Sequence, residues 1–509
     1  MEWGNATLVK KNDVKRTRIV ATIGPASSNE EVIRGMIRAG MDVARINFSH
    51  GDHETHARNI ATIRKVAAEE DAVVAIMGDL QGPKIRLGKI SPDPVHLNKG
   101  DRLTLTTHEG ANGADMVFPL PHPEFVRDVR SGHILLIDDG ALEFKVLTAT
   151  STDLFCEVVV DGPLSSRKGV SAPKSRLTLP AMPQKDRDDA KFALEQRLDY
   201  LAMSFVRSAK DMLELRFLCR NWGVEDVALI AKIEKHEAIE NFDEILRESD
   251  GIMVARGDLG VETPAEAVPI HQKEIIRRCN EVGKPVITAT QMLQSMITNP
   301  RPTRAEASDV ANAIFDGSDA VMLSGETASG KYPIIAVETM ASIAMIAERN
   351  FDRATRSDRA ERALLALEET KAQEPTREGF AVAVSRTAGI LADVLGAKAI
   401  VATTWTGSTA RQVARSRPKT PIYCVTPNEV SVRRMALVWG VLPILVPEFT
   451  TIDDMITKVV STLHQHRLVE FDDVLVIIAG MPFGIGGHAN FSKIHRVGEL
   501  GEVPNTGLA

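Results

Sequence analysis

Short apolar runs recur along the chain, and most of them are followed by a segment whose apolar residues have helical spacing. Eight of these runs end at glycine or at polar side chains, as buried strands do. Most lie roughly 25 to 35 residues apart, with one long gap after the third. Eight strands that alternate with helices predict a TIM (β/α)8 barrel. The expected strands are Arg18–Gly24, Met41–Gly51, Val73–Asp79, Asp199–Phe205, Val227–Ile230, Ile252–Ala255, Pro285–Thr290 and Asp319–Ser324.

Helix starts are marked by capping patterns. Ser28 and Glu31 have the spacing of a capping box, and Thr303 and Glu306 repeat it later in the chain. Between the fifth and sixth strands, His236–Glu248 carries apolar residues at helical spacing and predicts one helix. These two strands and this helix form a β-α-β unit.

The alternation of predicted strands and helices is interrupted once. Residues 83–180 alternate in period two, contain many turn residues and show little helical pattern, which predicts an inserted β-rich domain. The catalytic barrel is therefore assigned to residues 1–82 and 181–350. Residues 351–509 begin with a charged helical region and return to an α/β pattern, which predicts a separate C-terminal domain with a mostly parallel sheet. Its expected strands are Ala397–Thr404, Pro421–Thr426, Leu442–Pro447 and Asp473–Gly480.

Composition excludes several classes of protein. The 509 residues carry a net charge of −7, which does not favour binding to nucleic acid or to a membrane surface. The four cysteines are far apart and lack metal-ligand spacing, which is typical of a reduced, cytoplasmic protein. The first residues lack the apolar segment of a signal peptide, and no apolar run reaches transmembrane length.

Polar residues gather at the predicted strand ends, where the sites of parallel α/β folds lie. Glu234 and Asp258 follow adjacent strands and could share one hard cation such as Mg²⁺. Lys232 beside them would face developing negative charge. Together the set suits a phosphorylated, anionic substrate held through a metal. The full set is Arg45, Asn47, Ser49, Asp79, Lys232, Glu234, Arg256, Asp258, Thr290, Ser324 and Glu326.

Other interpretations of these residues compete with a site for a metal and a phosphorylated substrate. The charged pairs are also typical of a salt-bridged cluster that closes a barrel end, and Thr290 alone is more often a structural hydroxyl. The run Gly325–Lys331 has the glycine and lysine spacing of a P-loop, but Tyr332 stands where Ser or Thr must bind Mg²⁺. No GxGxxG follows the first strand, so a dinucleotide fold is not supported.

Seven motifs together resemble the pyruvate kinase family over nearly the whole chain. The resemblance implies phosphoryl transfer from phosphoenolpyruvate to ADP, giving pyruvate and ATP. It also implies a mobile inserted domain that closes over the site and excludes water. The motifs are ARINFSHG (44–51), DLQGPKIR (79–86), AKIEKHE (231–237), MVARGDLGVE (253–262), TATQMLQSM (288–296), NPRPTRAE (299–306) and VMLSGETASGKYP (321–333).

The resemblance assigns roles to individual residues. Glu234 and Asp258 match the ligands of Mg²⁺ or Mn²⁺, and Lys232 and Arg45 match the cations that neutralise the transferring phosphoryl group. The backbone N–H groups of Gly257 and Asp258 match the site of the substrate carboxylate. Thr290 matches the residue near the enolate carbon, which acts through water. The nucleotide positions are matched by Asn47, His50, Arg86 and, in the inserted domain, Lys168.

One departure from the family concerns K⁺. Many members hold K⁺ with residues that match Asn47, Ser49, Asp79 and the carbonyl of Leu80, and they carry glutamate where this chain has Lys84. The chain therefore resembles the K⁺-independent branch, in which an ammonium supplies the missing positive charge. We expect activity without K⁺.

The C-terminal domain resembles the effector domain of the family. Its phosphate-binding loop is matched by Thr404, Thr406, Gly407, Ser408 and Thr409, whereas the alternative is an ordinary β-α turn. Ser408 stands where several fructose-bisphosphate-responsive relatives have arginine, so the resemblance implies a phosphorylated effector without identifying it. It also implies a homotetramer. Two other functions remain open: an Mg²⁺-dependent lyase acting on pyruvate enolate, and a metabolite sensor that retains the fold.

Overall fold

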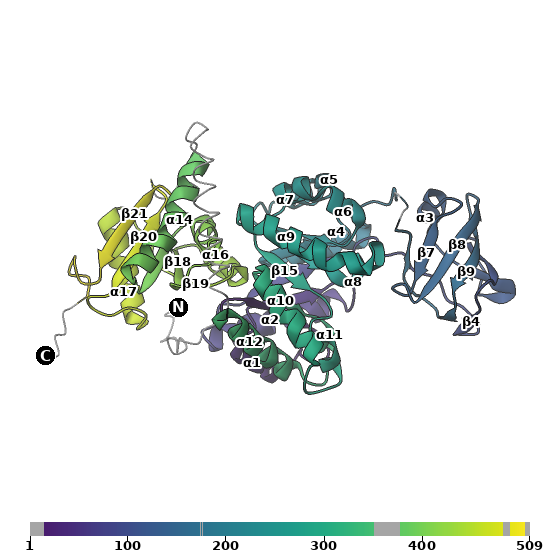
Figure 1. Ribbon diagram of the computed structural model, residues 1–509, viewed down its shortest axis with the longest axis horizontal. Coiled ribbons are helices and arrows are strands. Elements are labelled where there is room, and N and C mark those ends of the chain that lie inside the picture. Colours follow the sequence, from purple (N-terminus) through teal and green to yellow (C-terminus); the bar gives the residue numbers. More distant parts are fainter. Residues whose placement is uncertain (1–14, 174, 176, 351–376, 482–488, 504–509) are drawn as a thin grey trace.

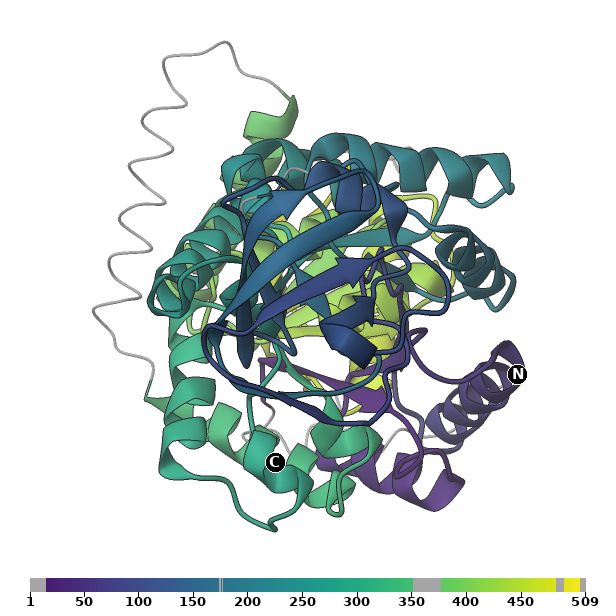
Figure 2. The same ribbon diagram turned by 90° about the vertical axis from the view of Figure 1, so that its right-hand side faces the viewer.

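The computed structural model describes residues 15–173, 175, 177–350, 377–481 and 489–503. It shows three parts in a row, with a central barrel between the inserted domain and the C-terminal domain (Figure 1). Seen from the side of the inserted domain, that domain lies in front of the barrel (Figure 2). Most of the expected charged leader, and the helical region expected after Asn350, fall on residues 1–14 and 351–376, outside the described residues.

The eight predicted strands form a closed parallel barrel, which confirms the predicted fold class. Its order is β1-β16-β15-β14-β13-β12-β3-β2, so each strand pairs with the next barrel strand along the chain, β12 pairs with β3 across the insertion, and β16 closes on β1. The strands are β1 (Arg18–Ile23), β2 (Val43–Asn47), β3 (Ala75–Asp79), β12 (Tyr200–Met203), β13 (Ala228–Ile233), β14 (Gly251–Ala255), β15 (Val286–Ala289) and β16 (Ala320–Leu323).

The barrel strands are apolar on both sides because both sides are buried. Alternate residues such as Val20, Met77 and Ile230 fill the barrel interior. The residues between them, such as Ile19 and Ile76, pack against the surrounding helices. This explains why the strands appear in the sequence as continuous apolar runs.

The helices start and stop largely where the capping patterns indicate. Thr303 and Glu306 form the predicted capping box. The prediction for the first helix is wrong by one residue, because Asn29 rather than Ser28 caps it and accepts from the Val32 N–H. The predicted single helix at 236–248 is two helices that meet at Asn241. The barrel helices are α1 (Glu30–Ala39), α2 (His53–Glu69), α4 (Gln184–Glu195), α5 (Ala209–Asn221), α6 (His236–Glu240), α7 (Phe242–Glu248), α8 (Arg256–Glu262), α9 (Val268–Val282), α10 (Arg304–Asp316), α11 (Gly325–Ala328) and α12 (Pro333–Arg349), with the 3₁₀ turns η2 (Ala265–Ala267) and η3 (Gln294–Ile297).

The inserted domain follows β3 and is a β structure with its own apolar core. Six strands form one sheet in the order β11-β7-β8-β9-β5-β6, and β10 pairs with β4. Its elements are β4 (Val95–Leu97), β5 (Arg102–Thr106), η1 (Ala114–Met116), β6 (Val117–Pro119), α3 (Pro123–Asp128), β7 (Ile134–Ile137), β8 (Leu142–Ala149), β9 (Asp153–Val160), β10 (Gly162–Leu164) and β11 (Val170–Ser171).

The C-terminal domain is a five-stranded sheet in the order β19-β18-β17-β20-β21, covered by apolar clusters on both faces. Four strands are the predicted parallel ones, whereas β21 is antiparallel to β20 and was not predicted. The elements are α14 (Arg377–Leu395), β17 (Ala399–Thr403), α15 (Ser408–Ala414), β18 (Ile422–Thr426), α16 (Glu429–Arg434), η4 (Met435–Leu437), β19 (Val441–Leu445), α17 (Ile452–Gln465), β20 (Val474–Ala479) and β21 (Phe491–Arg496).

The C-terminal domain closes the end of the barrel at which the strands begin. Ala436 and Leu437 of η4 join the apolar cluster inside the barrel. The hydroxyl of Tyr200, the first residue of β12, donates to the carbonyl of Arg434 at 2.6 Å. The opposite end of the barrel, where the strands finish, carries the inserted domain (Figure 1).

One buried arginine joins the two parts. Arg417 of the C-terminal domain donates to the Gly317 carbonyl at 2.6 Å and to Asp319 Oδ1 at 3.2 Å. Its guanidinium also lies 4.5 Å from the ring centroid of Trp439. The domain is therefore held against the barrel by directional contacts as well as by apolar packing.

Within the described residues, no helix has both the length and the apolar character needed to cross a membrane.

Replacing Arg417 with methionine is expected to lower the free energy of unfolding by about 3 kcal/mol, because the change leaves the Asp319 carboxylate buried without this cation. The pair is almost fully buried, with 5% and 10% of its side chains exposed. The matched control is Arg496→Met, because Arg496 and Asp472 form a pair that is 58% and 64% exposed. Chemical unfolding measures both variants. Equal losses in the two would contradict a special role for Arg417.

Candidate active site

A buried carboxylate organises the end of the barrel where the strands finish. Asp79, the last residue of β3, is 1% exposed. Its Oδ2 accepts from Arg45 Nε of β2 at 2.7 Å, and its Oδ1 lies 3.1 Å from Lys232 Nζ of β13. Arg45 also donates to the hydroxyl of Thr22 in β1 at 2.9 Å. One carboxylate thus places two cations on the same rim of the barrel.

The Lys232 ammonium has three polar neighbours. It lies 3.0 Å from Glu234 Oε1 and donates to Ser204 Oγ at 2.6 Å, in addition to the contact with Asp79. Glu234 Oε2 accepts from the N–H of Phe205 at 2.6 Å. Phe205 has a φ of +55°, a conformation that costs free energy in a bulky residue, and the turn directs this N–H toward Glu234.

The charges of these groups depend on one another. Burial alone would lower the pKa of Lys232, but Asp79 and Glu234 outweigh burial and raise it, so the ammonium stays charged. Burial alone would likewise raise the pKa of Asp79, but the Lys232 and Arg45 cations hold it below its ordinary value. Burial raises the pKa of Glu234 and the nearby Asp258 charge adds to this rise, while Lys232 opposes it.

The Glu234 and Asp258 carboxylates fit a divalent cation. Their like charges act on each other at a buried rim, which is unfavourable unless a cation lies close to both. Mg²⁺ prefers oxygen ligands and usually keeps several water or substrate oxygens in its shell. Among the described residues, no three or more His, Cys, Asp or Glu side chains form a group that could hold a metal ion by themselves. Two protein carboxylates leave room for substrate to complete the shell.

Thr290 lies in a strained turn after β15. The φ of Thr290 is +69°, which is rare for a β-branched residue, and the φ of the next residue, Gln291, is +54°. The Thr290 hydroxyl accepts from the N–H of Gly257 at 2.9 Å, which joins the end of β15 to the start of α8. Of the two N–H groups expected to receive the substrate carboxylate, that of Gly257 is therefore already bonded in this structure.

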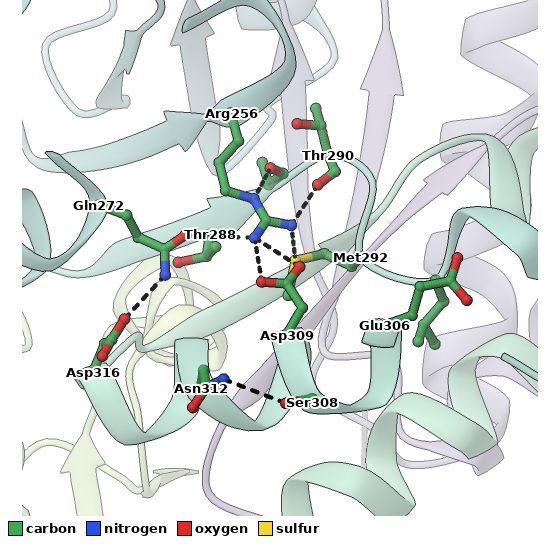
Figure 3. Close-up of polar contacts among 12 residues, drawn as sticks. Arg256, Gln272, Thr288, Thr290, Met292, Glu306, Ser308, Asp309, Asn312 and Asp316 are labelled. Carbon is green, nitrogen blue, oxygen red and sulfur yellow. Dashed lines mark hydrogen bonds and ion pairs between the residues drawn. The ribbon is translucent and has the colours of Figure 1, made fainter. Parts of the chain in front are cut away.

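Arg256 holds this turn in place (Figure 3). Its guanidinium donates to the Ala289 carbonyl at 3.3 Å and to the Thr290 carbonyl at 2.7 Å. It also pairs with Asp309 of α10 at 2.8 Å. The sequence placed Arg256 at the rim but assigned it no role, because its contacts come from β15 and α10, far away in the chain.

Several other predicted site residues lie in the segments that follow β2 and β3. Asn47 and Ser49 share the loop after β2, where Asn47 Oδ1 accepts from the Ser49 N–H, and His50 beside them is exposed. The Leu80 carbonyl accepts from Ser204 Oγ at 2.6 Å. Lys84 lines a pocket with Asp258, between the barrel and the inserted domain.

Two predicted residues of the inserted domain, Lys168 and Arg86, have their partners within that domain and not among the charged residues of the barrel rim. Lys168 Nζ pairs with Asp138 Oδ2 at 2.8 Å, and Arg86 donates to the Arg167 carbonyl at 3.1 Å. Another rim residue, Glu326, is fully buried and accepts from the N–H groups of Leu293 and Ser324. Glu326 therefore stabilises the backbone of two strand ends.

The predicted effector loop connects β17 to α15 in the C-terminal domain. Thr404 Oγ1 accepts from the N–H of Gly407 at 3.1 Å, and Gly407 has a φ of +81°. Thr406 follows in this turn, and Ser408 and Thr409 begin α15.

Comparison with known proteins identifies the family. The family model described as "Pyruvate kinase, barrel domain" matches residues 14–337, and "Pyruvate kinase, alpha/beta domain" matches residues 382–495. The chain belongs to the pyruvate kinase family.

Relatives that match nearly the whole of this chain support this result. A pyruvate kinase of Clostridium perfringens is 43% identical over 484 residues, which cover 95% of this chain and 100% of the relative. One from Geobacillus stearothermophilus is 45% identical over 488 residues, covering 96% and 81%. The crystal structure of a pyruvate kinase from Cryptosporidium parvum is 36% identical and has a TM-score of 0.86, covering 95% of this chain and 96% of that one. The prediction of a phosphotransferase of the pyruvate kinase type is confirmed.

Replacing Arg256 with lysine is expected to lower kcat for the family reaction by about 100-fold, because a lysine cannot hold both carbonyls of the Thr290 turn and small displacements of reacting groups are costly. The binding of Mn²⁺ should change little, since Glu234 and Asp258 remain. Steady-state kinetics and Mn²⁺ titration measure the two effects. Arg277→Lys, on the exposed side of α9, is the control. A kcat equal to that of the control would show that the turn does not need Arg256.

Proposed function

We propose that the barrel rim transfers the phosphoryl group of phosphoenolpyruvate to ADP, with Lys232 and Arg45 as the cations that face the transferred group. The observation that supports this most is the position of Asp79, which holds both cations on one rim. Phosphoryl transfer requires little covalent chemistry from the protein, so positioning and charge stabilisation supply most of the acceleration. The buried Lys232 keeps its proton at neutral pH and therefore remains a cation.

Glu234 and Asp258 would hold Mg²⁺ or Mn²⁺ together with the oxygens of phosphoenolpyruvate. When bound, the metal supplies positive charge that polarises the phosphoryl and enolate oxygens. The backbone N–H groups of Gly257 and Asp258, at the start of α8, would receive the substrate carboxylate. The Thr290 hydroxyl would position the water that protonates the enolate carbon. Binding of the substrate carboxylate would then compete with Thr290 for the N–H of Gly257.

The inserted domain would close over the nucleotide. Asn47, His50, Arg86 and Lys168 are the proposed nucleotide contacts. Lys168 is paired with Asp138, so closure would exchange a partly exposed ion pair for contacts with the nucleotide phosphates. A closed site excludes water and protects the phosphoryl group from hydrolysis.

On the family resemblance we also propose a homotetramer, a cytoplasmic location and a phosphorylated effector at Thr404, Thr406, Gly407, Ser408 and Thr409. The domain limits 1–82 with 181–350, 83–180 and 351–509 belong to the same proposal.

Turnover is expected without K⁺. Two of the oxygen groups matched to the K⁺ site already have partners, because Asp79 pairs with Arg45 and Lys232, and the Leu80 carbonyl accepts from Ser204. Formation of pyruvate and ATP from phosphoenolpyruvate and ADP with Mg²⁺, in buffers with and without K⁺, tests both the reaction and this point. Large stimulation by K⁺ would contradict K⁺ independence, and no turnover in either buffer would contradict the reaction.

A substitution at Lys84 isolates the role of its charge. Lys84→Glu is expected to make turnover dependent on K⁺, because the variant removes the positive charge that we assign to the place of the ion. Lys89→Glu, an exposed lysine of the same segment, is the control and should stay independent of K⁺. Equal dependence of turnover on K⁺ in the two variants would show that the charge of Lys84 does not take the place of K⁺.

Replacing Glu234 with glutamine is expected to lower kcat by at least about 100-fold and to weaken Mn²⁺ binding, because one of two charged ligands is lost. Electron paramagnetic resonance of Mn²⁺ measures binding independently of turnover. Glu237→Gln, three residues further on, is the control. Unchanged Mn²⁺ affinity in Glu234→Gln would place the metal elsewhere.

A further inference from the structure

A buried ion pair lies one residue away from the proposed metal ligand Glu234. The ammonium of Lys235 donates to Glu262 Oε1 at 2.5 Å. Only 13% of the Lys235 side chain and 3% of the Glu262 side chain are exposed. Lys235 directly follows Glu234, and Glu262 is the last residue of α8, the helix that carries the second proposed ligand, Asp258. The pair therefore joins the two segments that supply the proposed metal ligands.

Stability alone is a poor explanation for this pair. Removing two charges from water is unfavourable, and well-packed apolar residues in the same place are often equally stable or more stable. The pair also satisfies only one oxygen of Glu262. Among the described residues its Oε2 has no hydrogen-bond partner, and His236 Nδ1 lies 4.0 Å from it. The position that such a pair fixes explains its presence better than the free energy that it contributes.

Lys235 also reaches the turn that holds Glu234. Its Nζ lies 5.9 Å from the centroid of the Phe205 ring, within the range of a cation–π contact. The N–H of Phe205 donates to Glu234 Oε2 at 2.6 Å. Because Phe205 has a positive φ, the turn persists only where surrounding contacts support it. Lys235 supplies one of these contacts and so acts on the Glu234 side of the metal site.

Glu262 acts on the Asp258 side through a short helix. The helix α8 has seven residues, and the residue before it, Ala255, provides no side-chain cap. Contacts with neighbouring elements hold its two ends instead, since Arg256 pairs with Asp309 of α10 and Glu262 pairs with Lys235. Asp258 lies between these two anchored residues. Loss of the contact at Glu262 would leave α8 anchored at its start alone.

The ion pair borders the proposed active site, because Lys235 and Glu262 line the same pocket as Asp258. We propose that this pair is a positioning device, which sets the distance between the Glu234 and Asp258 carboxylates and thereby the affinity for the divalent metal. The inference rests on the proposed function, since it takes Glu234 and Asp258 as the metal ligands. Mg²⁺ demands closely defined ligand distances, and residues that orient metal ligands commonly change metal affinity by about tenfold or more.

Charge and position predict opposite results for Lys235→Gln. If the ammonium acted only through its charge, its removal would strengthen the binding of Mn²⁺, because a nearby cation repels the metal. If the ammonium holds α8 and the Phe205 turn, its removal frees both ligands and weakens binding. We expect Mn²⁺ to bind about tenfold more weakly to Lys235→Gln and to Glu262→Gln.

Electron paramagnetic resonance titration of the full-length protein with Mn²⁺, in the absence of substrate, measures this affinity without turnover. Lys273→Gln is the matched control, because Lys273 of α9 also pairs with a carboxylate, that of Asp316, but is 59% exposed. Its affinity for Mn²⁺ should equal that of the unaltered protein. Circular dichroism establishes that each variant is folded before its affinity is compared.

The double variant with Lys235→Gln and Glu262→Gln tests whether the two residues act as a unit. Because it leaves neither partner charged, it also avoids an unpaired buried charge. A pair that acts as a unit loses its effect once, so the double variant should bind Mn²⁺ about as weakly as either single variant. A loss equal to the product of the two single losses would show independent action and contradict the proposal.

Three further results would overturn the positioning role. These are Mn²⁺ binding to Lys235→Gln that is as tight as in the unaltered protein or tighter, an equal loss in Lys273→Gln, and a raised KM for ADP with unchanged Mn²⁺ affinity. The last result would mean that Lys235 contacts the nucleotide. Glu234→Gln distinguishes failure of the proposed function, because unchanged Mn²⁺ affinity in that variant would place the metal elsewhere. Weaker binding in Glu234→Gln with unchanged binding in Lys235→Gln would overturn the positioning role alone.

Discussion

The catalytic end of this protein depends on one buried carboxylate, Asp79. A carboxylate removed from water is unfavourable unless cations and donors surround it, and Arg45 and Lys232 satisfy that requirement here. The same requirement fixes the positions of the two cations, which come from different strands. Lys232 in turn touches Glu234, so the proposed metal ligand is part of one continuous network. The contacts that neutralise the buried charges therefore also fix the positions of the proposed reacting groups.

Parallel closure of the barrel makes this network possible. Because all eight strands run the same way, their ends meet on one rim, and residues distant in the chain become neighbours. The other end of the barrel is left for packing, and the C-terminal domain fills it with Ala436 and Leu437.

Two strained backbone positions lie at the rim of the barrel, where they serve contacts between strand ends. Phe205 and Thr290 both have positive φ, and both lie directly after barrel strands. In each case the turn serves a contact across the rim, from the Phe205 N–H to Glu234 and from the Gly257 N–H to the Thr290 hydroxyl. Such conformations persist only where surrounding contacts over-determine them, and Arg256 supplies several of those contacts at Thr290.

The sequence by itself determined the eight barrel strands, the inserted β domain and the rim residues, because strand burial, helix spacing and strand-end chemistry are local patterns. It also predicted the capping box at Thr303, which depends on two residues three positions apart. It missed β21, the break at Asn241 and the Asn29 cap, where pairing and hydrogen bonds selected among similar local patterns. Only the tertiary structure decided that Asp79 joins Arg45 to Lys232, that Arg256 holds Thr290, that Glu326 is structural and that Lys168 pairs with Asp138. Those contacts depend on strand order and domain placement, which bring together residues that no local pattern connects.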